Sequence, residues 1–219
     1  MKFDIIVNNL PFLIESSWIT IKITVFAFIL GLLIASIVGI SRSYQMPKVW
    51  EAILAIYVEV FRGTPLLIQL FFLYYGLPSI GINMDSYTAA ILGLALNGGA
   101  YMSEAIRAAI LSIDKGQEEA AFALGYNKLQ AIIHIILPQA FRVALPTLMN
   151  SFSSLLKESS LVSVLAITEL TRSGQLIYTR TSRPFEIYLT LGVFYFVMTY
   201  SVSLLARTIE RKVNLKYIR

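Results

Sequence analysis

Long apolar runs recur along this chain and constrain its fold more than any other feature. Five of them reach the length of about 20 helical residues that a hydrocarbon core of about 30 Å requires. Strands of a membrane barrel would alternate apolar and polar residues, which these runs do not, and every amide in lipid needs an internal partner. The sequence therefore predicts an all-α integral membrane protein, one transmembrane domain over residues 1–219, with five transmembrane helices at residues 18–40, 49–75, 87–110, 141–167 and 187–206.

The composition supports this fold class and excludes several kinds of chemistry. The chain is 57% hydrophobic and 14% charged, whereas a soluble domain carries about 25% charged residues. It has no cysteine and a single histidine, His134, so we expect neither disulfides nor thiolate chemistry nor a metal site. The net charge of +5 is explained by membrane orientation, and we expect no nucleic-acid partner.

The basic residues between the predicted spans are distributed unequally. By the positive-inside rule, the side with more Lys and Arg is cytoplasmic. The N-terminus is therefore predicted outside and the C-terminus in the cytoplasm. One side receives eleven such residues and the other four: Arg42, Lys48, Arg107, Lys115, Lys128, Arg142, Arg207, Arg211, Lys212, Lys216 and Arg219 against Lys2, Arg172, Arg180 and Arg183.

Residues 112–140, on the cytoplasmic side between the third and fourth spans, are too polar to cross the membrane and too patterned to be disordered. A first short helix is predicted at residues 117–124, because Gly125 follows where a helix end needs a left-handed residue. Its surface has acidic side chains at one edge and small side chains elsewhere. Such a surface can bind either in a groove on a soluble partner or on the inner leaflet of the membrane. The residues of this surface are Glu118, Glu119, Ala120, Ala121, Ala123 and Leu124.

A second short helix is predicted in the same loop. Asn127 stands at its start, and Gln130 three residues later completes a pattern similar to a capping box. Leu137-Pro138 is expected to end it.

The loop resembles the EAA motif of ATP-binding-cassette importer permeases. Glu119-Ala120-Ala121, three residues, Gly125, nine residues, Ile135, one residue and Leu137-Pro138 match that motif in identity and spacing. Three further stretches resemble the branch that imports polar amino acids, and together the resemblance covers nearly the whole chain. They are VEVFRGTPLLIQL (58–70), AYMSEAIRAAILSIDKGQ (100–117) and LLKESSLVSVLAITELT (155–171).

The resemblance implies a multi-pass permease of the inner membrane. In this family the EAA loop holds a coupling helix that docks on the ATPase subunit, which binds ATP and Mg, so we expect no cofactor in this chain. It also implies an extracytoplasmic solute-binding protein, for which the loop at residues 171–186 is the expected docking surface or, alternatively, an exposed connector. The residues expected to couple to the ATPase are Glu118, Glu119, Ala120, Ala121, Leu124 and Gly125.

The sequence itself indicates partners. It contains no G-x-x-x-x-G-K-[ST] loop to hold the phosphates of ATP, so the ATPase must be another chain. Five spans do not contain two repeated halves, so we expect a second permease subunit, either an identical copy or a close relative, about a two-fold axis. The other expected contacts are the substrate and membrane lipid.

Five ionisable residues fall within the predicted spans: Glu59, Arg62, Glu104, Lys157 and Glu158. Such residues are costly in lipid, about 2.5–3.5 kcal/mol on insertion scales, and each is a hypothesis of function. Helical periodicity places three of them, Glu104, Lys157 and Glu158, on two polar stripes, which are expected to line a central cavity. The stripes are Gly93, Asn97, Tyr101 and Glu104 on the third helix, and Asn150, Ser154, Lys157, Glu158 and Leu161 on the fourth.

An amino acid substrate needs both signs of charge in its site. Glu104 or Glu158 can bind its ammonium, while Arg62, Lys157 or donors near Thr64 can bind its carboxylate. Pro65 removes one helix hydrogen bond there and can open backbone groups toward the cavity. The predicted substrate-binding residues are Asn97, Glu104, Glu158, Thr64, Arg62, Lys157, Tyr101 and Leu161.

A structural alternative remains open for these charges, because buried charges in membranes usually pair. Glu59 can neutralise Arg62, and Lys157 can pair with Glu104 across helices. The excess of carboxylates favours basic amino acids such as arginine, lysine or histidine, while Lys157 as a free cation in the cavity leaves a glutamate carrier open. The sequence thus predicts the permease subunit of an ATP-driven importer of polar, basic amino acids, which is no enzyme itself. The alternatives are an ion-coupled secondary amino acid carrier and a channel, neither of which gives a reason for the EAA-type loop.

Overall fold

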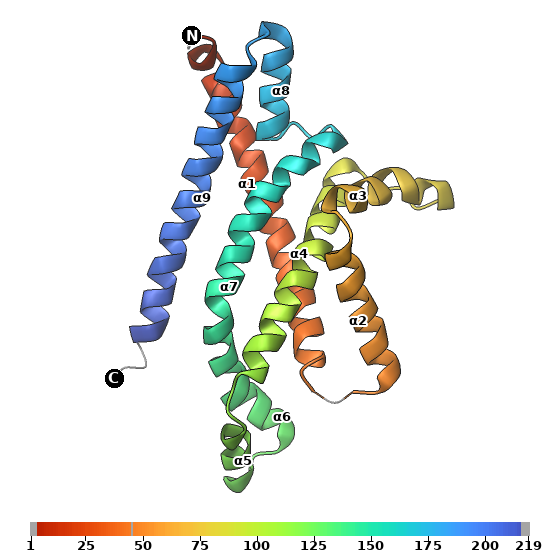
Figure 1. Cartoon of the computed structure of the whole chain (residues 1–219), viewed down its shortest axis with the longest axis vertical. Coiled ribbons are helices and arrows are strands. Elements are labelled where there is room, and N and C mark those ends of the chain that lie inside the picture. Colours follow the sequence, from red (N-terminus) through yellow and green to blue (C-terminus); the bar gives the residue numbers. More distant parts are fainter. Residues whose placement is uncertain (1–3, 45, 216–219) are drawn as a thin grey trace.

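The computed structural model describes residues 4–44 and 46–215, with side chains described up to residue 212. These residues form helices joined by short turns, and most of the helices run along the long axis of the molecule (Figure 1). In chain order the elements are α1 (Asp4–Ser41), α2 (Lys48–Gly63), α3 (Leu66–Phe71), the π-helical turn η1 (Phe72–Gly76), the 3₁₀ turn η2 (Leu77–Ile80), α4 (Ser86–Leu111), α5 (Lys115–Ala123), α6 (Lys128–Ala131), the π-helical turn η3 (Ile132–Ile136), α7 (Leu137–Glu158), the 3₁₀ turn η4 (Ser159–Leu165), α8 (Leu170–Thr181) and α9 (Pro184–Leu215).

Helices α1 and α4 pack so closely at their crossing that even the Cβ atom of an alanine does not fit at Gly39. On α1, the small residues Gly31, Ala35 and Gly39 recur every four positions and share one face. A Cβ atom at Gly39 would lie 2.6 Å from the backbone oxygen of Ser103, and one at Gly99 would lie 3.1 Å from that of Gly31. Small residues at this spacing let two membrane helices bring their backbones together.

The second predicted span is broken rather than continuous. Helix α2 ends at Gly63, Thr64 and Pro65 are extended, and the chain continues through α3, η1 and η2 at an angle of 109°. Pro65 has no N–H to donate and its ring crowds the helical carbonyl four residues earlier, which favours an interruption of the helix at this position. The second part forms an arm that projects sideways from the body of the molecule (Figure 1).

Within the described residues, three helical stretches are long and apolar enough to cross a membrane, and the bent pair of α2 with residues Leu66–Ile80 makes a fourth if it counts as one span. The three are Asp4–Ser41, Lys128–Leu165 and Pro184–Lys212. Helix α4 coincides with the third predicted span but is not among them. It packs against α1, α2 and α7, so much of its surface faces protein. The five-span topology remains a prediction.

The loop between α4 and α7 forms the two short helices expected, but their connection to α7 differs. Gly125 is left-handed (φ +85°), and Asn127 and Gln130 form the capping box. The expectation that Leu137-Pro138 ends the second helix is wrong. The chain passes through η3 into α7 with Pro138 in the first turn. A π-helical turn is wider than an α-helical turn. The extra width keeps the Pro138 ring away from the backbone carbonyl that it would contact in a regular α-helix.

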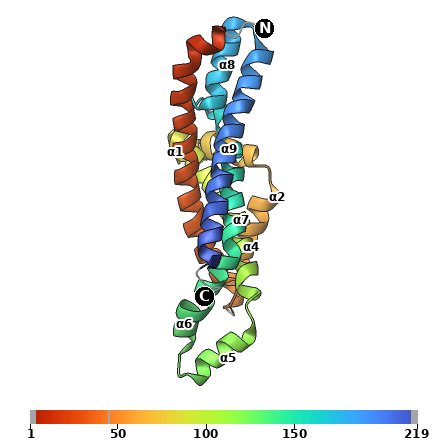
Figure 2. The same cartoon turned by 90° about the vertical axis from the view of Figure 1, so that its left-hand side faces the viewer.

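Helices α5 and α6 form one tip of the molecule, while the start of α1 and α8 form the opposite tip (Figure 2). Arg107, Lys115 and Lys128 lie on or next to the first tip, and Arg172 and Arg180 lie on α8. The fold thus separates the two sets of basic residues on which the orientation depends. Lys2, Lys216 and Arg219 of those sets lie outside the described residues, and the orientation itself remains a prediction.

A buried carboxylate anchors α8 to the long helices. Glu169 is fully buried and caps α8 by accepting hydrogen bonds from the backbone N–H of Thr171 (2.9 Å) and Arg172 (2.7 Å). It also accepts one from the hydroxyl of Tyr195 on α9 (3.1 Å), and Thr20 on α1 accepts one from the N–H of Leu170 (3.1 Å). These bonds compensate the cost of burying the carboxylate.

The packing of α1 on α4 predicts the effect of enlarging Gly39. Replacement by alanine should push the helices apart and lower stability by about 1–3 kcal/mol, seen as a lower midpoint of thermal unfolding of the detergent-solubilised protein. Gly192→Ala on α9 is the matched control, because a Cβ there meets nothing within 4 Å; its stability should be unchanged or higher by up to about 1 kcal/mol. Equal midpoints in the two variants would contradict the close approach.

Candidate functional site

A cavity of about 300 Å³ with several polar side chains in its lining lies between α4 and α7. It brings together side chains from both predicted polar stripes, because the two helices pack against each other along this length. Its lining combines an acid, two amides, hydroxyl groups and one aromatic ring, and it is open on one side. The lining residues are Asn97, Gly98, Tyr101, Thr147, Asn150, Ser151, Ser154, Leu155 and Glu158.

The broken end of α2 is held beside this cavity by two buried amides. Gln69 donates to the backbone oxygens of Phe61 (2.9 Å) and Thr64 (3.0 Å), and Asn97 donates to the same oxygen of Phe61 (3.0 Å) and to Oε1 of Gln69 (3.0 Å). Gln69 and Asn97 are 8% and 5% exposed. The last carbonyls of a helix have no partner within it, and here side chains supply the donors.

The other residues predicted to bind substrate lie at different distances from the cavity. The guanidinium of Arg62 lies 5.4 Å from the ring centre of Tyr101, whose hydroxyl donates to the Arg62 backbone oxygen (3.3 Å). Thr64 donates to the oxygen of Val60 (2.7 Å). Lys157 is exposed next to Glu158, and Leu161 packs on the apolar core made by α1, α3, α4 and η4.

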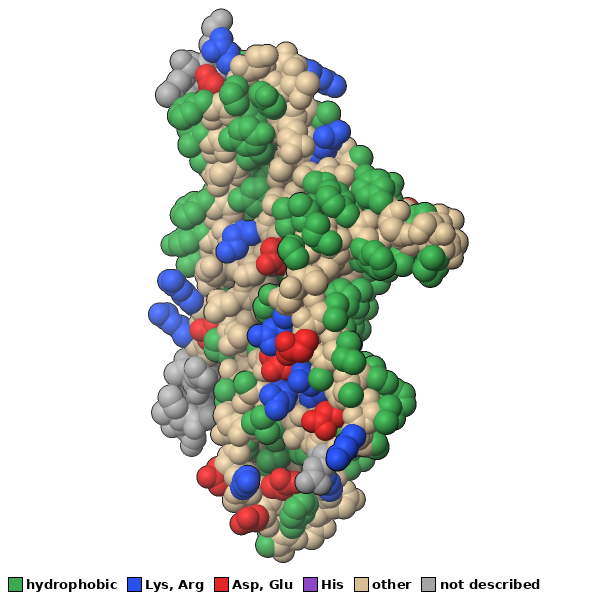
Figure 3. Space-filling view, turned by 45° about the vertical axis from the view of Figure 1, so that its right-hand side comes forward, with side chains coloured by type: hydrophobic (Ala, Val, Ile, Leu, Met, Phe, Trp, Pro, Cys, Tyr) green, Lys and Arg blue, Asp and Glu red, His purple; other side chains and the backbone are tan. Residues whose placement is uncertain are grey.

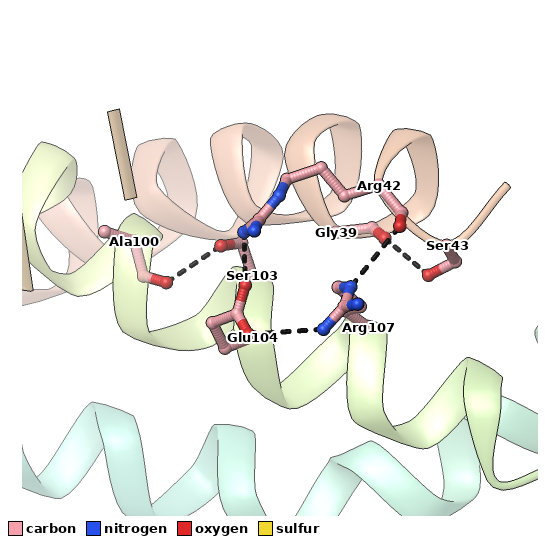
Figure 4. A network of polar contacts seen from close by, with 7 residues as sticks. All are labelled: Gly39, Arg42, Ser43, Ala100, Ser103, Glu104 and Arg107. Carbon is pink, nitrogen blue, oxygen red and sulfur yellow. Dashed lines mark hydrogen bonds and ion pairs between the residues drawn. The ribbon is translucent and has the colours of Figure 1, made fainter. Parts of the chain in front are cut away.

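Glu104 does not line the cavity. Its carboxylate pairs with Arg42, just after α1, and lies 3.7 Å from the guanidinium of Arg107, whose Nε donates to the backbone oxygen of Arg42 (3.3 Å) (Figure 4). The cross-helix pair with Lys157 that the sequence left open is therefore not formed, and no ion pair joins Glu59 to Arg62 among the described residues. The Arg42–Glu104–Arg107 network lies at the same crossing as Gly39 (Figure 4).

The tip formed by α5 and α6 exposes apolar side chains around the predicted coupling residues. Glu119, Ala120 and Gly125 are exposed, whereas Ala121 is buried against the chain itself. Exposed apolar patches of this kind mark interaction surfaces. The large apolar residues exposed here are Phe122, Leu124, Tyr126, Leu129 and Ile133.

Tyr44 ties this tip to the end of α1. The ammonium of Lys128 lies 5.6 Å from the centre of its ring, a cation–π contact. Burial raises the pKa of Tyr44, and the negative charge of Glu118 raises it further, so Glu118 belongs to the environment of the phenol.

At the other side of the membrane helices, Asp85 caps α4 by accepting from the N–H of Thr88 (2.8 Å), which lowers the pKa of Asp85.

Residues 9–215 match the family described as "Binding-protein-dependent transport system inner membrane component". The chain belongs to this family. Relatives of this inner membrane component include the L-cystine transport system permease protein TcyB of Bacillus subtilis (strain 168), 38% identical over 93% of this chain and 87% of TcyB. The glutamine transport system permease protein GlnP of Escherichia coli (strain K12) is 37% identical over 98% of this chain and 100% of GlnP.

Solved structures agree with the family. A chain from the crystal structure of an amino acid ABC transporter with histidines superposes with a TM-score of 0.90 and 39% identity, covering 97% of this chain and 99% of that one. The inner membrane component is therefore a transmembrane translocation subunit, and its ATPase is a separate subunit.

Two residues that build the site escape prediction from the sequence alone. Gln69 stands in an apolar run directly after Pro65, and a buried amide near a helix break is the available signal. Arg42 follows the first apolar run, where a basic residue is fully explained by membrane orientation. Neither signal identifies the partner residue, because Asn97 is 28 residues from Gln69 and Glu104 is 62 residues from Arg42.

The network around Glu104 predicts a structural role for this carboxylate. Glu104→Gln removes the negative charge between two arginines and should lower stability by about 1.5–3 kcal/mol, as for other hydrogen bonds to charged groups. Thermal unfolding of the purified protein measures this. Glu51→Gln on α2 is the control, because Glu51 is exposed and surface charges contribute little. An unchanged midpoint for Glu104→Gln would show that the network does not hold α1 to α4.

Proposed function

We propose that this chain is the permease subunit of an ATP-driven importer of polar, basic amino acids. The observation that carries the proposal is the cavity between α4 and α7, which places the carboxylate of Glu158 beside the amides of Asn97 and Asn150 and several hydroxyl groups. Relatives named as permeases for arginine, glutamine and L-cystine support amino acids as the substrates, and of these three the arginine permease matches the basic class.

The chemistry of the cavity favours a cationic group on the substrate. Glu158 is an acceptor only when ionised, and an ammonium or guanidinium that meets it gains a charge-assisted hydrogen bond. Within the described residues no basic side chain belongs to the lining of this cavity. The substrate's cation therefore binds at Glu158, with Asn97 and Tyr101 completing the contact.

The substrate carboxylate needs donors, and these lie at the margin of the cavity. Arg62 is held over the ring of Tyr101, and Lys157 precedes Glu158 on the exposed side of α7. Together with Thr64 and the core residue Leu161 they complete the proposed site. Glu104 is occupied by two arginines below the cavity, so we assign it to holding α1 on α4 rather than to the substrate.

A second permease subunit completes this site. Glu59, Arg62 and Lys157 are exposed although they fall in the proposed spans, and lipid is a costly surrounding for charge. Figure 3 shows acidic and basic side chains gathered along one face of the molecule, between hydrophobic flanks. We assign this face to a second subunit and the water-filled path between the two. Five spans then correspond to α1, α2 with α3, α4, α7 and α9, with the N-terminus outside.

The tip at α5 and α6 transmits the ATPase cycle. Its exposed apolar residues and acidic edge fit a cleft on a soluble ATPase, which binds ATP and Mg. Tyr44 and Lys128 link the tip to α1, and η3 continues it into α7, which carries Glu158. Movement of the tip therefore reaches the cavity through a continuous helix. At the opposite tip, residues 171–186 receive the extracytoplasmic solute-binding protein.

Binding to the purified permease–ATPase complex tests the substrate class. Arginine, histidine, glutamine and glutamate are compared by calorimetry or radioligand binding, and the basic amino acids should bind most tightly. Glu158→Gln should weaken their binding about 10- to 100-fold, the value of a lost charge-assisted hydrogen bond, with unchanged thermal stability. Glu51→Gln is the control. Preferred binding of glutamate, or no binding at all, would overturn the proposal. ATP-independent transport under an ion gradient would instead favour a secondary carrier.

The left-handed turn at Gly125 tests the coupling role. A valine there is strained at φ +85°, because β-branched residues strongly disfavour this region. Gly125→Val should insert and assemble normally but hydrolyse ATP without transport, measured as the ratio of transported substrate to ATP hydrolysed in proteoliposomes. Gly192→Ala serves as the control. An unchanged ratio in Gly125→Val would contradict a coupling role for this loop.

A further inference from the structure

The buried amides of Gln69 and Asn97 form a network in which the orientation of each is fixed. Gln69 faces three oxygens, those of the Phe61 and Thr64 backbone and the Thr64 hydroxyl, at 2.8–3.0 Å. Carbonyl oxygens only accept hydrogen bonds, and the hydroxyl proton of Thr64 is donated to Val60. The nitrogen of the Gln69 amide must therefore face these oxygens, and its own oxygen must face Asn97.

This arrangement determines which atom Asn97 offers to the cavity. Both N–H groups of Asn97 have acceptors, the Phe61 oxygen and Oε1 of Gln69, each at 3.0 Å. Within the described part of the chain, no group donates to Oδ1 of Asn97, yet no buried side-chain atom lacks a partner. Oδ1 is therefore accessible, and Asn97 lines the cavity. Asn97 therefore presents its amide oxygen, which only accepts hydrogen bonds, to the cavity that Glu158 also lines.

An asparagine without this support could turn its amide and present either end. With the nitrogen outward it would donate to a carboxylate, and with the oxygen outward it accepts from an ammonium or guanidinium. Two acceptors make the choice. One is the Phe61 oxygen, which Gln69 also contacts, and the other is Oε1 of Gln69, which is 28 residues away in sequence and is not part of the cavity lining.

We propose that Gln69 is a positioning residue that sets substrate specificity, by holding the Asn97 amide with its oxygen toward the cavity so that a nitrogen-bearing cation is accepted there. The inference rests on the proposed function, since it concerns the same cavity. It also gives a reason for the preference for cations: the Asn97 amide reinforces Glu158 because the buried Gln69 amide keeps the Asn97 side chain from turning.

The test compares arginine with two analogues on the purified permease–ATPase complex. One is its α-hydroxy acid, which lacks the ammonium, and the other is citrulline, whose side chain is neutral. Gln69→Met keeps the side-chain volume but removes the hydrogen bonds. In this variant the preference for arginine over one of the two analogues should fall about tenfold. Gln139→Leu, which removes an amide on α7 outside the cavity, should leave both preferences unchanged.

A rescue variant separates positioning from a purely structural role. Gln69→Met with Asn97→Asp presents oxygen whichever way the side chain turns, so the preference should return even though neither position 69 nor position 97 then donates to the Phe61 oxygen. Unchanged preferences in Gln69→Met, or a double variant that fails to restore them, would overturn the inference. If Gln69→Met yields no folded complex, Gln69→Glu decides, because it keeps an oxygen toward the Asn97 nitrogen while losing the donors to Phe61 and Thr64: retained preference supports the inference and loss overturns it.

The failure of the underlying proposal is visible separately. An unmodified complex that binds no arginine would overturn the proposed site before any variant is made. If the unmodified complex binds arginine and the Gln69→Met variant shows the same preferences as the unmodified complex, only the proposed role of Gln69 is overturned.

Discussion

The close approach of α1 and α4 is the constraint on which the other features depend. Glycines on both helices remove the side chains that would hold the backbones apart, and in a membrane such packing takes the place of the hydrophobic effect between helices. This approach brings Arg42 within reach of Glu104 and fixes α4 as the central helix. Helices α2 and α7 then pack on α4, and the cavity opens between α4 and α7.

The broken α2 shows how a membrane protein supports irregular backbone. Free carbonyls at membrane depth are tolerated where protein groups satisfy them, and here Gln69, Asn97 and Tyr101 supply the donors. Asn97 and Tyr101 also line the cavity, and Gln69 is hydrogen-bonded to Asn97, so the groups that satisfy the helix end and the groups that line the site belong to one network. A substitution that loosens the break should therefore also change what the cavity accepts.

Local features were the most predictable from sequence. The left-handed Gly125 and the Asn127–Gln130 capping box depend on neighbouring residues and were confirmed, whereas Leu137-Pro138 was misread because η3 absorbs the proline within a continuing helix. Helical periodicity placed Asn97, Tyr101, Asn150, Ser154 and Glu158 on stripes that meet in one cavity. It could not separate Glu104 from them, because the stripe says nothing about an arginine on another helix.

The sequence by itself determined the helical membrane class, the family and the existence of a compact capped loop, because each follows from hydropathy or from residues close together in the chain. Tertiary structure decided the partners of Glu104 and the orientation of the Asn97 amide. These depend on distances between segments far apart in sequence: Glu104 pairs with Arg42 because α1 and α4 touch, and Asn97 faces the cavity with its oxygen because the α2 break brings Gln69 beside it.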